Sequence, residues 1–555
     1  MPTAREWFVA DFETTSERYY QLHGYTRVWL YAIADSNGNA ITHGSSIEQF
    51  FSYCRNNLCG KIIYFHNLKF DGAFLLDYLF SIGYKADYKD KPPKTFSTLI
   101  GDMGEFYTID VRVSAKRTLH FADSLKLLPF KVSYIATSFG LPILKEKIDY
   151  DDYTIDAARI SYVEHDVRIV AMALAEIKAH GMLKGTTASC AYNAYTSSCD
   201  DRFLSYCFPT LDIDFLSEWR KAYRGGRCQV SPLYQGRILT NVLRYDVNSM
   251  YPHVMRNCAL PYGLPVHCAT LSSLQRFKFG LMHVRIEFML KKYHMPTLLK
   301  KGGLYSSGDS YYTYSEGEEE LWLSTIDYEL LLRHYDVLSF IYLDGYGFYT
   351  STKMFTSYID KWYSRKKVDK LGKKQVDKFM LNCLYGKFGT DAMKRQKVVY
   401  YEDEKVKFRY TDYEESTHYY LPVAIAVTSY AHKIIDDAIE SVGYENFVYC
   451  DTDSVHAIAK MSDRMVDATE LGKFKLEGIE EMSKYVRQKC YLTYEEKKMK
   501  ITCAGMSEEM KESIIKEYGL KLFDEFDIGF KCGGKKLPQR VKGGVVLHET
   551  TFEIK

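Results

Sequence analysis

Two aspartates separated by one residue, Asp451 and Asp453, follow the apolar residues Phe447 and Val448 and precede an alternating apolar and polar run. This pattern predicts a strand, a tight turn and a second strand, with both carboxylates projecting from the turn. Two negative charges held so close repel each other, so each would take up a proton unless a cation lies between them. A hard divalent ion such as Mg²⁺ binds carboxylates together with substrate phosphates. Taken alone, the pair is also consistent with solvated turn residues.

A third acid for this cluster is Asp246, at the end of a strand that the sequence predicts to stop at Pro252. Tyr251, just before the proline, could pack against a sugar ring and leave no room for a 2′-hydroxyl. That arrangement would select deoxyribose. Ordinary core packing is the alternative interpretation of this tyrosine.

Four more acids lie in the first 185 residues. Asp11 and Glu13 end an apolar strand and share one face of it, Asp71 follows the next apolar strand, and Asp166 lies on a long predicted helix. Carboxylates from three elements are what two-metal hydrolysis of a phosphodiester requires, because one ion activates water and the other stabilises the leaving oxygen. Tyr162, one helical turn before Asp166, could hold the attacking water. Strand-end and helix-surface acids are the simpler alternative.

Basic residues, Lys366 among them, crowd a segment at 353–388 that is predicted to be helical. Four residues fall on one stripe at helical spacing: Lys374, Lys378, Asn382 and Tyr385. Two ammonium groups, an amide and a phenol suit a nucleoside triphosphate, with Lys378 neutralising the leaving pyrophosphate. Tyr385 would then pack on the incoming base pair.

Two further motifs could contact nucleic acid. The turn Tyr223-Arg224-Gly225-Gly226-Arg227 combines glycines that permit close backbone approach with arginines that can reach phosphates, although a simple glycine turn is equally consistent. Lys489 and Tyr491 form a cation–phenol pair that could touch a primer phosphate and base, or could be a surface lysine and a packed tyrosine.

The composition sets outer bounds on the function. The chain has 555 residues, enough for about three or four domains, and its net charge of +2 does not indicate a nucleic-acid partner, so any basic surface must be local. The 13 cysteines include no Cys-x-x-Cys pair, which argues against a disulfide framework and a structural zinc site and suits a reducing cytosol. No signal peptide and no apolar run of about 18 residues are present, so we expect a soluble, cytoplasmic protein.

The remaining chain is predicted in outline. Strands alternating with helices indicate an α/β domain of about 185 residues. An aromatic and glycine-rich insertion follows at about 258–350, an exposed hairpin at 400–418, and a helix at about 422–441. A small basic β-rich module ends the chain at 518–555.

Taken in order, these motifs resemble those of the family B DNA polymerases, and within them the protein-primed branch. The family's three exonuclease motifs resemble residues 11–15, 66–71 and 162–166, and its three polymerase motifs resemble residues 246–252, 378–386 and 449–454. Further likenesses are the single-strand-binding motif at 123–125, the catalytic lysine at Lys145, the linker motif at 223–226, the primer-binding motif at 489–491, and the segments 501–506 and 543–546.

The resemblance implies a multidomain α/β and α+β fold. A ribonuclease-H-like 3′–5′ exonuclease domain would precede a right-hand polymerase with palm, fingers and thumb and two protein-priming insertions. The expected segments are exonuclease 1–188, palm 189–257 and 419–517, first insertion 258–350, fingers 351–392, second insertion 393–418 and thumb 518–555. In the family the first insertion contacts a terminal protein, and the second closes a ring around template and product.

The resemblance also implies residue roles. The expected catalytic residues are Asp246, Asp451, Asp453, Asp11, Glu13, Asp71, Asp166, Tyr162 and Lys145. The expected metal set is Asp246, Val247, Asp453, Asp11, Glu13, Asp71 and Asp166. The expected nucleotide-binding set is Tyr251, Lys366, Lys378, Asn382, Tyr385 and Val247. The expected DNA-binding set is Asn67, His66, Phe70, Thr14, Ser124, Leu125, Tyr223, Arg224, Gly225, Gly226, Ser249, Lys374, Gly386, Thr452, Lys489 and Tyr491.

The function implied is a protein-primed, DNA-templated DNA polymerase with a proofreading 3′–5′ exonuclease. It would be processive and strand-displacing, and it would replicate a linear phage-type genome. We expect two Mg²⁺ per active site, replaceable by Mn²⁺. Expected partners are template and primer DNA, dNTPs, a terminal protein acting as primer, and single-stranded-DNA-binding and origin-binding proteins. We expect a monomer without membrane contact.

Two alternatives and two departures complete the prediction. A nuclease whose second half only grips DNA would need no triphosphate pocket, so Lys378 and Asn382 argue against it. A non-catalytic replication scaffold would carry its acids as surface charge only. Cys383 stands where the family usually has Ser, and His432 where a phage member has Arg. Neither departure touches an expected metal ligand.

Overall fold

The N-terminal part is built on an eight-stranded sheet. The computed structural model describes residues 6–146, 151–182, 184–300 and 311–555. The strand order is β3-β2-β1-β4-β8-β7-β6-β5. The bounds are β1 Trp7–Thr14, β2 Val28–Asp35, β3 Ala40–Gly44, β4 Ile62–Phe65, β5 Lys85–Ala86, β6 Thr95–Ile100, β7 Phe106–Ser114 and β8 Arg117–Asp123. Strands β7 and β8 pair antiparallel and form a hairpin across 106–123.

Side-chain alternation along β1 divides this sheet into two apolar faces. Phe8, Ala10 and Phe12 point into a core formed with α2 (Ile47–Asn57) and α3 (Leu68–Ser81). Val9 packs instead with the buried side of α5 (Ala157–Ala179). Because Asp11 and Glu13 share the parity of Val9, the strand delivers both acids to the side covered by α5.

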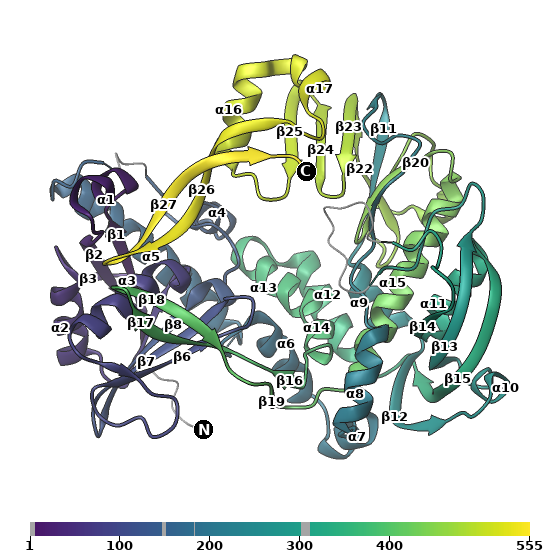
Figure 1. Cartoon of the computed structure of the whole chain (residues 1–555), viewed down its shortest axis with the longest axis horizontal. Coiled ribbons are helices and arrows are strands. Elements are labelled where there is room, and N and C mark those ends of the chain that lie inside the picture. The colour runs from purple at the N-terminus through teal and green to yellow at the C-terminus, as the bar shows by residue number, and fades with distance from the viewer. Residues whose placement is uncertain (1–5, 147–150, 183, 301–310) are drawn as a thin grey trace.

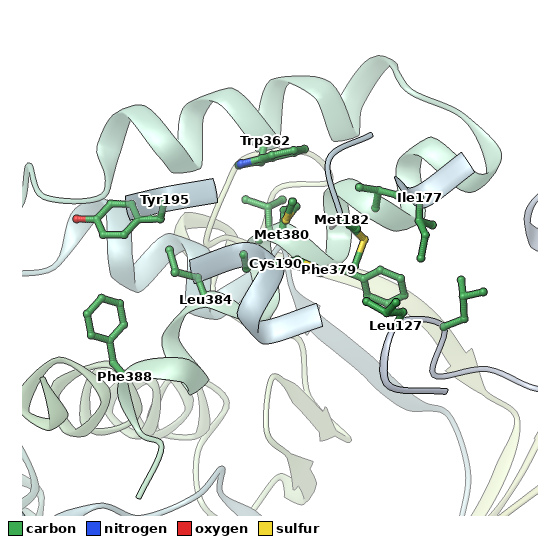
Figure 2. Packing of buried hydrophobic residues seen from close by; sticks show 14 of the residues in the cluster. Leu127, Ile177, Met182, Cys190, Tyr195, Trp362, Phe379, Met380, Leu384 and Phe388 are labelled. Carbon is green, nitrogen blue, oxygen red and sulfur yellow. The ribbon is translucent and has the colours of Figure 1, made fainter. Parts of the chain in front are cut away.

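One apolar core runs from this sheet into the helices that follow. Figure 2 shows Ile177 and Met182 close to Phe379, and Cys190 and Tyr195 facing the residues of the later helices. Those helices are α6 (Thr187–Thr196), α12 (Thr356–Val368), α13 (Leu371–Asn382) and α14 (Leu384–Phe388). The expected boundary at residue 188 therefore lies inside a continuous core. The segment 353–388 is helical as predicted, but it is divided into three helices, so the stripe predicted on one helix is broken and Tyr385 lies on α14.

The second sheet is antiparallel and has the order β22-β11-β21-β20-β9. Its strands are β9 Cys228–Val230, β11 Val242–Val247, β20 Phe447–Asp451, β21 Ser454–Ala457 and β22 Phe474–Glu480. The long helix α15 (Leu421–Val442) and the short α9 (Met250–Asn257) contribute to the core on one of its faces. The predicted strand–turn–strand around Asp451 and Asp453 and the predicted helix at about 422–441 are both confirmed.

The prediction that Pro252 ends a strand is wrong. Strand β11 ends at Val247, Ser249 adopts a left-handed φ of 57°, and helix α9 begins at Met250. Pro252 is buried in the first turn of that helix. A proline is tolerated there because first-turn N–H groups have no partner within the helix.

The predicted insertion forms a sheet of its own, in the order β12-β15-β13-β14. Its strands are β12 Leu260–His267, β13 Phe279–Leu290, β14 Glu319–Ser324 and β15 Tyr335–Ser351, with the helices α10 (Leu271–Leu274) and α11 (Thr325–His334). The strand-like runs of the sequence at 281–288 and 337–343 lie within β13 and β15. Residues 301–310 of this expected segment lie outside the described residues.

A long C-terminal hairpin crosses the molecule to the N-terminal domain. Strands β26 (Lys531–Val541) and β27 (Gly544–Glu553) form the yellow ribbon that reaches the purple elements in Figure 1. At its tip the Thr26 N–H donates to the Lys542 carbonyl at 3.0 Å. Gly543 has φ 90°, and a Cβ there would lie 1.9 Å from the Thr26 oxygen. Only glycine therefore fits at position 543 when the tip contacts this surface.

The hairpin predicted to be exposed at 400–418 is instead half buried. Its strands are β17 (Lys397–Glu402) and β18 (Lys405–Tyr410), and Val399 and Val406 join the apolar core of the N-terminal domain. Arg540 of β26 lies 3.9 Å above the Phe408 ring, and Lys542 pairs with Glu404 at 2.6 Å. The hairpin, the C-terminal strands and the first domain therefore meet at one place.

A fourth sheet, β10-β23-β24-β25, leads into the C-terminal hairpin. Its strands are β10 Ile238–Leu239, β23 Met482–Arg487, β24 Cys490–Glu495 and β25 Lys498–Cys503, followed by α16 (Glu508–Tyr518) and α17 (Leu522–Glu525). One core holds residues from Val486 to Ile554 together. Across the described ranges, no helix is long and apolar enough to cross a membrane.

Candidate active sites

The first acid cluster lies between β1 and α5. Ligand oxygens of Asp11, Glu13 and Asp166 lie within 4.8 Å of one another, the one such group of three that the described residues contain. Glu13 and Asp166 are 8% and 4% exposed. The cluster lines a cavity of about 200 Å³ together with His66, Lys145 and Tyr162, among others. The structure therefore brings together three of the four acids predicted for this site, with Tyr162 and Lys145 beside them.

Burial and mutual repulsion disturb the titration of these acids. Burial, followed by the charge of Asp166, raises the pKa of Asp11 from 3.8 to about 7. Burial and then the charges of Asp11 and Asp166 raise the pKa of Glu13 well above its ordinary value. Such crowding of buried carboxylates is stable in ionised form only with compensating positive charge. One oxygen of Asp166 also has no hydrogen-bond partner in the described structure, although it is buried.

The fourth acid, Asp71, enters from the first turn of α3 and is 4% exposed. Burial, and after it the charge of Asp11, raises its pKa well above the ordinary value, which places it beside the cluster. The ammonium of Lys145 pairs with Asp166 and lies 4.9 Å from the centre of the Tyr162 ring. A positive charge that can hold either carboxylate or phosphate is thus already in the site.

The turn after β4 presents the residues expected to hold single-stranded DNA. Asn67 is exposed and has a left-handed φ of 81°. Its N–H and that of Leu68 donate to the Asp123 carboxylate at 3.1 and 3.3 Å. Asn67 and the partly buried Phe70 line a second cavity, of about 460 Å³, where the hairpin β17–β18 and strands β26 and β27 meet this domain.

Ser124 does not fit its expected role as a direct DNA contact. It is fully buried, its hydroxyl donates to the Phe65 carbonyl at 3.0 Å, and it lies 3.0 Å from His66 Nδ1. The other ring nitrogen of His66 lies 2.7 Å from the Phe130 carbonyl. Ser124 therefore orients His66 at the cavity wall, while the partly exposed Leu125 and Thr14 remain accessible.

The second acid cluster lies at the end of the five-stranded sheet. Strand β11 places Asp246 opposite Ser454, and the Val247 N–H donates to the Asp453 carbonyl at 2.8 Å. Burial, and then the charge of Asp453, raises the pKa of Asp246 to about 7. Burial also raises the pKa of Asp453. The two acids therefore share one site, as the sequence predicted.

Asp451 faces a different partner from the other two acids. The ammonium of Lys489 lies 2.7 and 2.8 Å from its two carboxylate oxygens. This lysine lies in the turn between β23 and β24, 38 residues further along the chain. Tyr491, the other member of the predicted pair, packs with Tyr449 and Tyr485 at ring-centre distances of 5.1 Å.

Residues predicted to bind a nucleotide converge from four helices, α9, α12, α13 and α14. The rings of Tyr251 and Tyr385 stack at 4.1 Å, which joins α9 to α14. The Lys366 ammonium lies 2.7 Å from Ser249 Oγ. Burial, and then the charges of Lys378 and Lys374, lowers the pKa of Lys366. The three lysines thus form one positively charged patch next to Asp246, and Asn382 and Gly386 are exposed on the same segment.

The glycine turn packs against the aspartate turn. A Cβ on Gly226 would lie 2.8 Å from Thr452 Oγ1, and the Thr452 N–H donates to the Arg227 carbonyl at 2.7 Å. Tyr223 lies against Gly389 just after α14, since a Cβ there would lie 2.7 Å from the Tyr223 hydroxyl. Gly225 is exposed beside them. The turn therefore connects the aspartate turn to the segment that follows α14.

The prediction that the arginines of this turn reach phosphates does not fit their burial. Arg224 is 5% exposed and donates to the carbonyls of Leu299, Ala222 and Trp322 at 3.2 to 3.3 Å. Arg227 is 2% exposed and pairs with Asp436 at 2.9 Å. Both guanidinium groups hold the turn to the insertion sheet and to α15.

The sequence missed the role of one contributor to the sites and the presence of another. Asp123, named only as part of the 123–125 motif, caps the turns at both Asn67 and Leu125. Glu477 of β22 acts on Asp246 by its charge and pairs with Lys475 at 2.8 Å. The β11–β22 register that brings them together is a long-range pairing without a local sequence pattern.

Comparison with known proteins agrees with this geometry. The profile of the family described as DNA polymerase type B, organellar and viral, matches residues 54–155 and 146–471. The DNA polymerases of Bacillus phage M2 and Bacillus phage phi29 are each 33% identical to this chain, over 100% and 99% of both chains. The DNA polymerase of Streptococcus phage Cp-1 is 32% identical over 99% of this chain and 98% of its own.

Solved structures match over the same length. The phi29 DNA polymerase complexed with primer-template DNA superposes with a TM-score of 0.91 at 31% identity, over 99% of this chain and 100% of that one. Its complex with primer-template DNA and incoming nucleotide substrates gives a TM-score of 0.89 at the same identity.

Fold, acid clusters and matches together define a multidomain polymerase with an exonuclease domain followed by palm, fingers and thumb. The chain belongs to the type B DNA polymerases of organelles and viruses. Within that family it is a DNA-directed DNA polymerase of the phage type, related over its full length to the enzyme of phage phi29. The predicted fold class and family are confirmed.

Proposed function

We propose that this enzyme extends DNA at the Asp246–Asp453 site and removes 3′-terminal nucleotides at the Asp11–Glu13–Asp166 site. The observation that supports it best is the presence of two separate carboxylate clusters, each with its own lysine. A nuclease with a passive DNA-gripping half would not need Lys366, Lys374 and Lys378 gathered beside Asp246.

The donor sets fit divalent metal ions. Asp11, Glu13 and Asp166 offer oxygens within 4.8 Å of one another, with one buried Asp166 oxygen lacking a hydrogen-bond partner among the described residues. All-oxygen sets that share ligands with phosphate suit Mg²⁺, with Mn²⁺ as substitute. Asp246, Asp453 and Val247 would hold two ions at the polymerase site, with Asp451 assisting. Asp11, Glu13, Asp71 and Asp166 would hold two at the exonuclease site. Bound there, the ions activate an attacking oxygen and neutralise the leaving one.

In the polymerase site the protein orients the substrates. Lys378 and Lys366 would bind the triphosphate and balance its charge. Tyr251, stacked on Tyr385, would occupy the space beside the sugar and exclude a 2′-hydroxyl. Asn382, exposed at the end of α13, and Ser249, 2.7 Å from the Lys366 ammonium, would also contact the nucleotide or the template. Lys489 pairs with Asp451 in the free enzyme. When DNA binds, it would pair instead with a phosphate of the primer backbone.

In the exonuclease site Tyr162 would orient the attacking water and Lys145 would bind the scissile phosphate. Asn67, Phe70, Thr14 and Leu125 would hold the frayed strand, because all four are at least partly exposed. His66, fixed by Ser124, would line the same wall. The glycine turn, through Gly226 and Thr452, would pass the primer end between sites.

We further propose that the first strand is primed by a protein. A terminal protein would supply a side-chain hydroxyl and dock on the insertion sheet β12-β15-β13-β14. The hairpin β17–β18 and the C-terminal hairpin would close around DNA, which would make synthesis processive and strand-displacing. The segments 1–188, 189–257, 258–350, 351–392, 393–418, 419–517 and 518–555 remain the proposed division. The enzyme would act as a monomer in the cytoplasm of an infected cell, with single-stranded-DNA-binding and origin-binding proteins as partners.

Separability of the two activities is the direct test. The double variant Asp11→Ala, Asp71→Ala should lose degradation of a labelled single strand by at least a thousandfold and keep primer extension within about twofold. Asp453→Ala should show the converse. Loss of both activities in either variant, with an unchanged melting temperature, contradicts two independent sites.

Protein priming has its own experiment. The enzyme is incubated with a linear template bearing its genome end, labelled dNTP and candidate terminal protein. A labelled covalent protein–nucleotide adduct that Asp453→Ala cannot form is the expected product. Initiation only from oligonucleotide primers would contradict the priming proposal and leave the polymerase assignment intact.

A further inference from the structure

Two thiols face each other inside the C-terminal core, next to the proposed primer-contact residues. Cys490 begins β24 and Cys503 ends β25, and the two are register partners. Their Sγ atoms lie 3.4 Å apart, and both residues are buried, with exposures of 0% and 4%. All 13 cysteines of the chain are free, so this contact is between two reduced side chains.

The ladder geometry at this point favours a bond between them. The Ala504 N–H donates to the Lys489 carbonyl at 2.9 Å, so the hydrogen bond joins the residues flanking the two cysteines. Cys490 and Cys503 are therefore a non-hydrogen-bonded pair, the kind in which opposed side chains come closest, with Cα atoms about 4.5 Å apart. Disulfides span Cα separations of about 4.4 to 6.8 Å. The strands need not separate or slip for the bond to form.

The surroundings also favour reaction at Cys503. The contact with the Cys490 thiol, together with the positive charges of Arg487 and Lys511, lowers the pKa of Cys503 against the opposing effect of burial. The same contact raises the pKa of Cys490. One sulfur is thus disposed to be the attacking thiolate and the other to keep its proton, which is the division that thiol–disulfide chemistry requires.

We infer that Cys490 and Cys503 form a reversible disulfide in the folded enzyme and that this bond lowers primer extension. The inference goes beyond the proposed function, since the cross-link is detected without any catalysis. With diamide as oxidant, the Cys503 thiolate adds to the N=N bond, the Cys490 sulfur then attacks Cys503 Sγ, and the hydrazine leaves. Two thiol protons and two electrons pass to the diazene, and a dithiol reverses the change.

The cost to extension follows from the neighbours of Cys490. A disulfide is about 2.05 Å long, so the two sulfurs must close by roughly 1.4 Å. Cys490 stands between Lys489, which pairs with Asp451, and Tyr491, which packs on Tyr449 behind the aspartate turn. Displacements of about 1 Å at positioning residues can cost up to a hundredfold in rate. We expect a loss of at least threefold at limiting primer.

The test uses the full chain under native conditions. The enzyme is treated with diamide, remaining thiols are alkylated, and cross-linked peptides are mapped by mass spectrometry. The expected result is a 490–503 cross-link, slower extension of a primed template, and recovery of both after dithiothreitol. Cys490→Ala and Cys503→Ala should each lose the cross-link and the inhibition together.

Cys532→Ala is the matched control, because this partly exposed thiol packs against the same core. It also lies close enough to Cys503 that the charge of Cys503, after burial, raises the pKa of Cys532. This variant should behave as wild type. A cross-link between Cys503 and Cys532 instead, or none in enzyme that still binds DNA, overturns the pairing. Full extension by stoichiometrically cross-linked enzyme, or inhibition that persists in Cys503→Ala, overturns the link to activity. A melting temperature for each variant excludes unfolding as the cause.

Discussion

Replacing Asp11 by asparagine should stabilise the metal-free enzyme, and the gain should depend on pH. Asp11 has a pKa raised from 3.8 to about 7 by burial and by Asp166. At about 1.4 kcal/mol for each pKa unit, ionised Asp11 destabilises the fold by about 4 kcal/mol above neutral pH. Below pH 4 the carboxyl is protonated in both states and this difference disappears. Because the unfolded chain ionises first, wild type loses stability relative to the variant as the pH rises from about 4 to about 7.

The assay is urea unfolding of both proteins at pH 4.5, 6 and 8, with EDTA and then with Mg²⁺. With EDTA, the free energy of unfolding of the variant relative to wild type should increase progressively with pH. At pH 8, Mg²⁺ should stabilise wild type more than the variant. Asp90→Asn, at an exposed acid of the same domain, should show neither effect. A gain in stability that is independent of pH, or equal stabilisation of both proteins by Mg²⁺, would refute the hypothesis that a bound cation offsets the repulsion among these carboxylates.

Three further changes test other parts of the structure. Tyr251→Val should lower the preference for dNTP over rNTP at least tenfold in single-nucleotide incorporation, because it opens the space beside the sugar; an unchanged ratio would exclude this gate. Lys489→Ala should raise the KM for primer roughly tenfold, equivalent to about 1.4 kcal/mol, and leave degradation of single strands unchanged. Gly543→Ala should shorten strand-displacement products severalfold without slowing addition of one nucleotide, since its Cβ would collide with Thr26. Gly533→Ala, where a methyl group meets open space, is its control, and equal product lengths in both would contradict a role for the tip.

Local patterns were sufficient for the strand-end acids. Asp11 and Glu13 share a face because the side-chain period of a strand is two, and the turn at Asp451 follows from the residues around it. The positions that were predicted wrongly depend on contacts distant in sequence. Arg224 is buried because its guanidinium donates to the carbonyls of Leu299 and Trp322 in the insertion, and nothing near it in the sequence indicates those partners.

A similar limit applies to Pro252 and Glu477. A proline stops a strand and fits the first turn of a helix equally well, so only the left-handed Ser249 decides between the two. Glu477 reaches Asp246 through a strand pairing that joins residues more than 200 positions apart. Such pairings depend on tertiary packing, which local sequence periodicity does not encode.

The continuous apolar core between the first sheet and the basic helices has a consequence for how the enzyme can evolve. Cutting the chain near residue 188 would separate Ile177 and Met182 from Phe379 and expose apolar surface on both fragments. Deleting the exonuclease domain would therefore destabilise the polymerase part and reduce DNA synthesis as well. Relatives that lose proofreading should therefore keep the whole exonuclease domain and inactivate it by substituting single carboxylates. The inactive domain would then still support the polymerase fold.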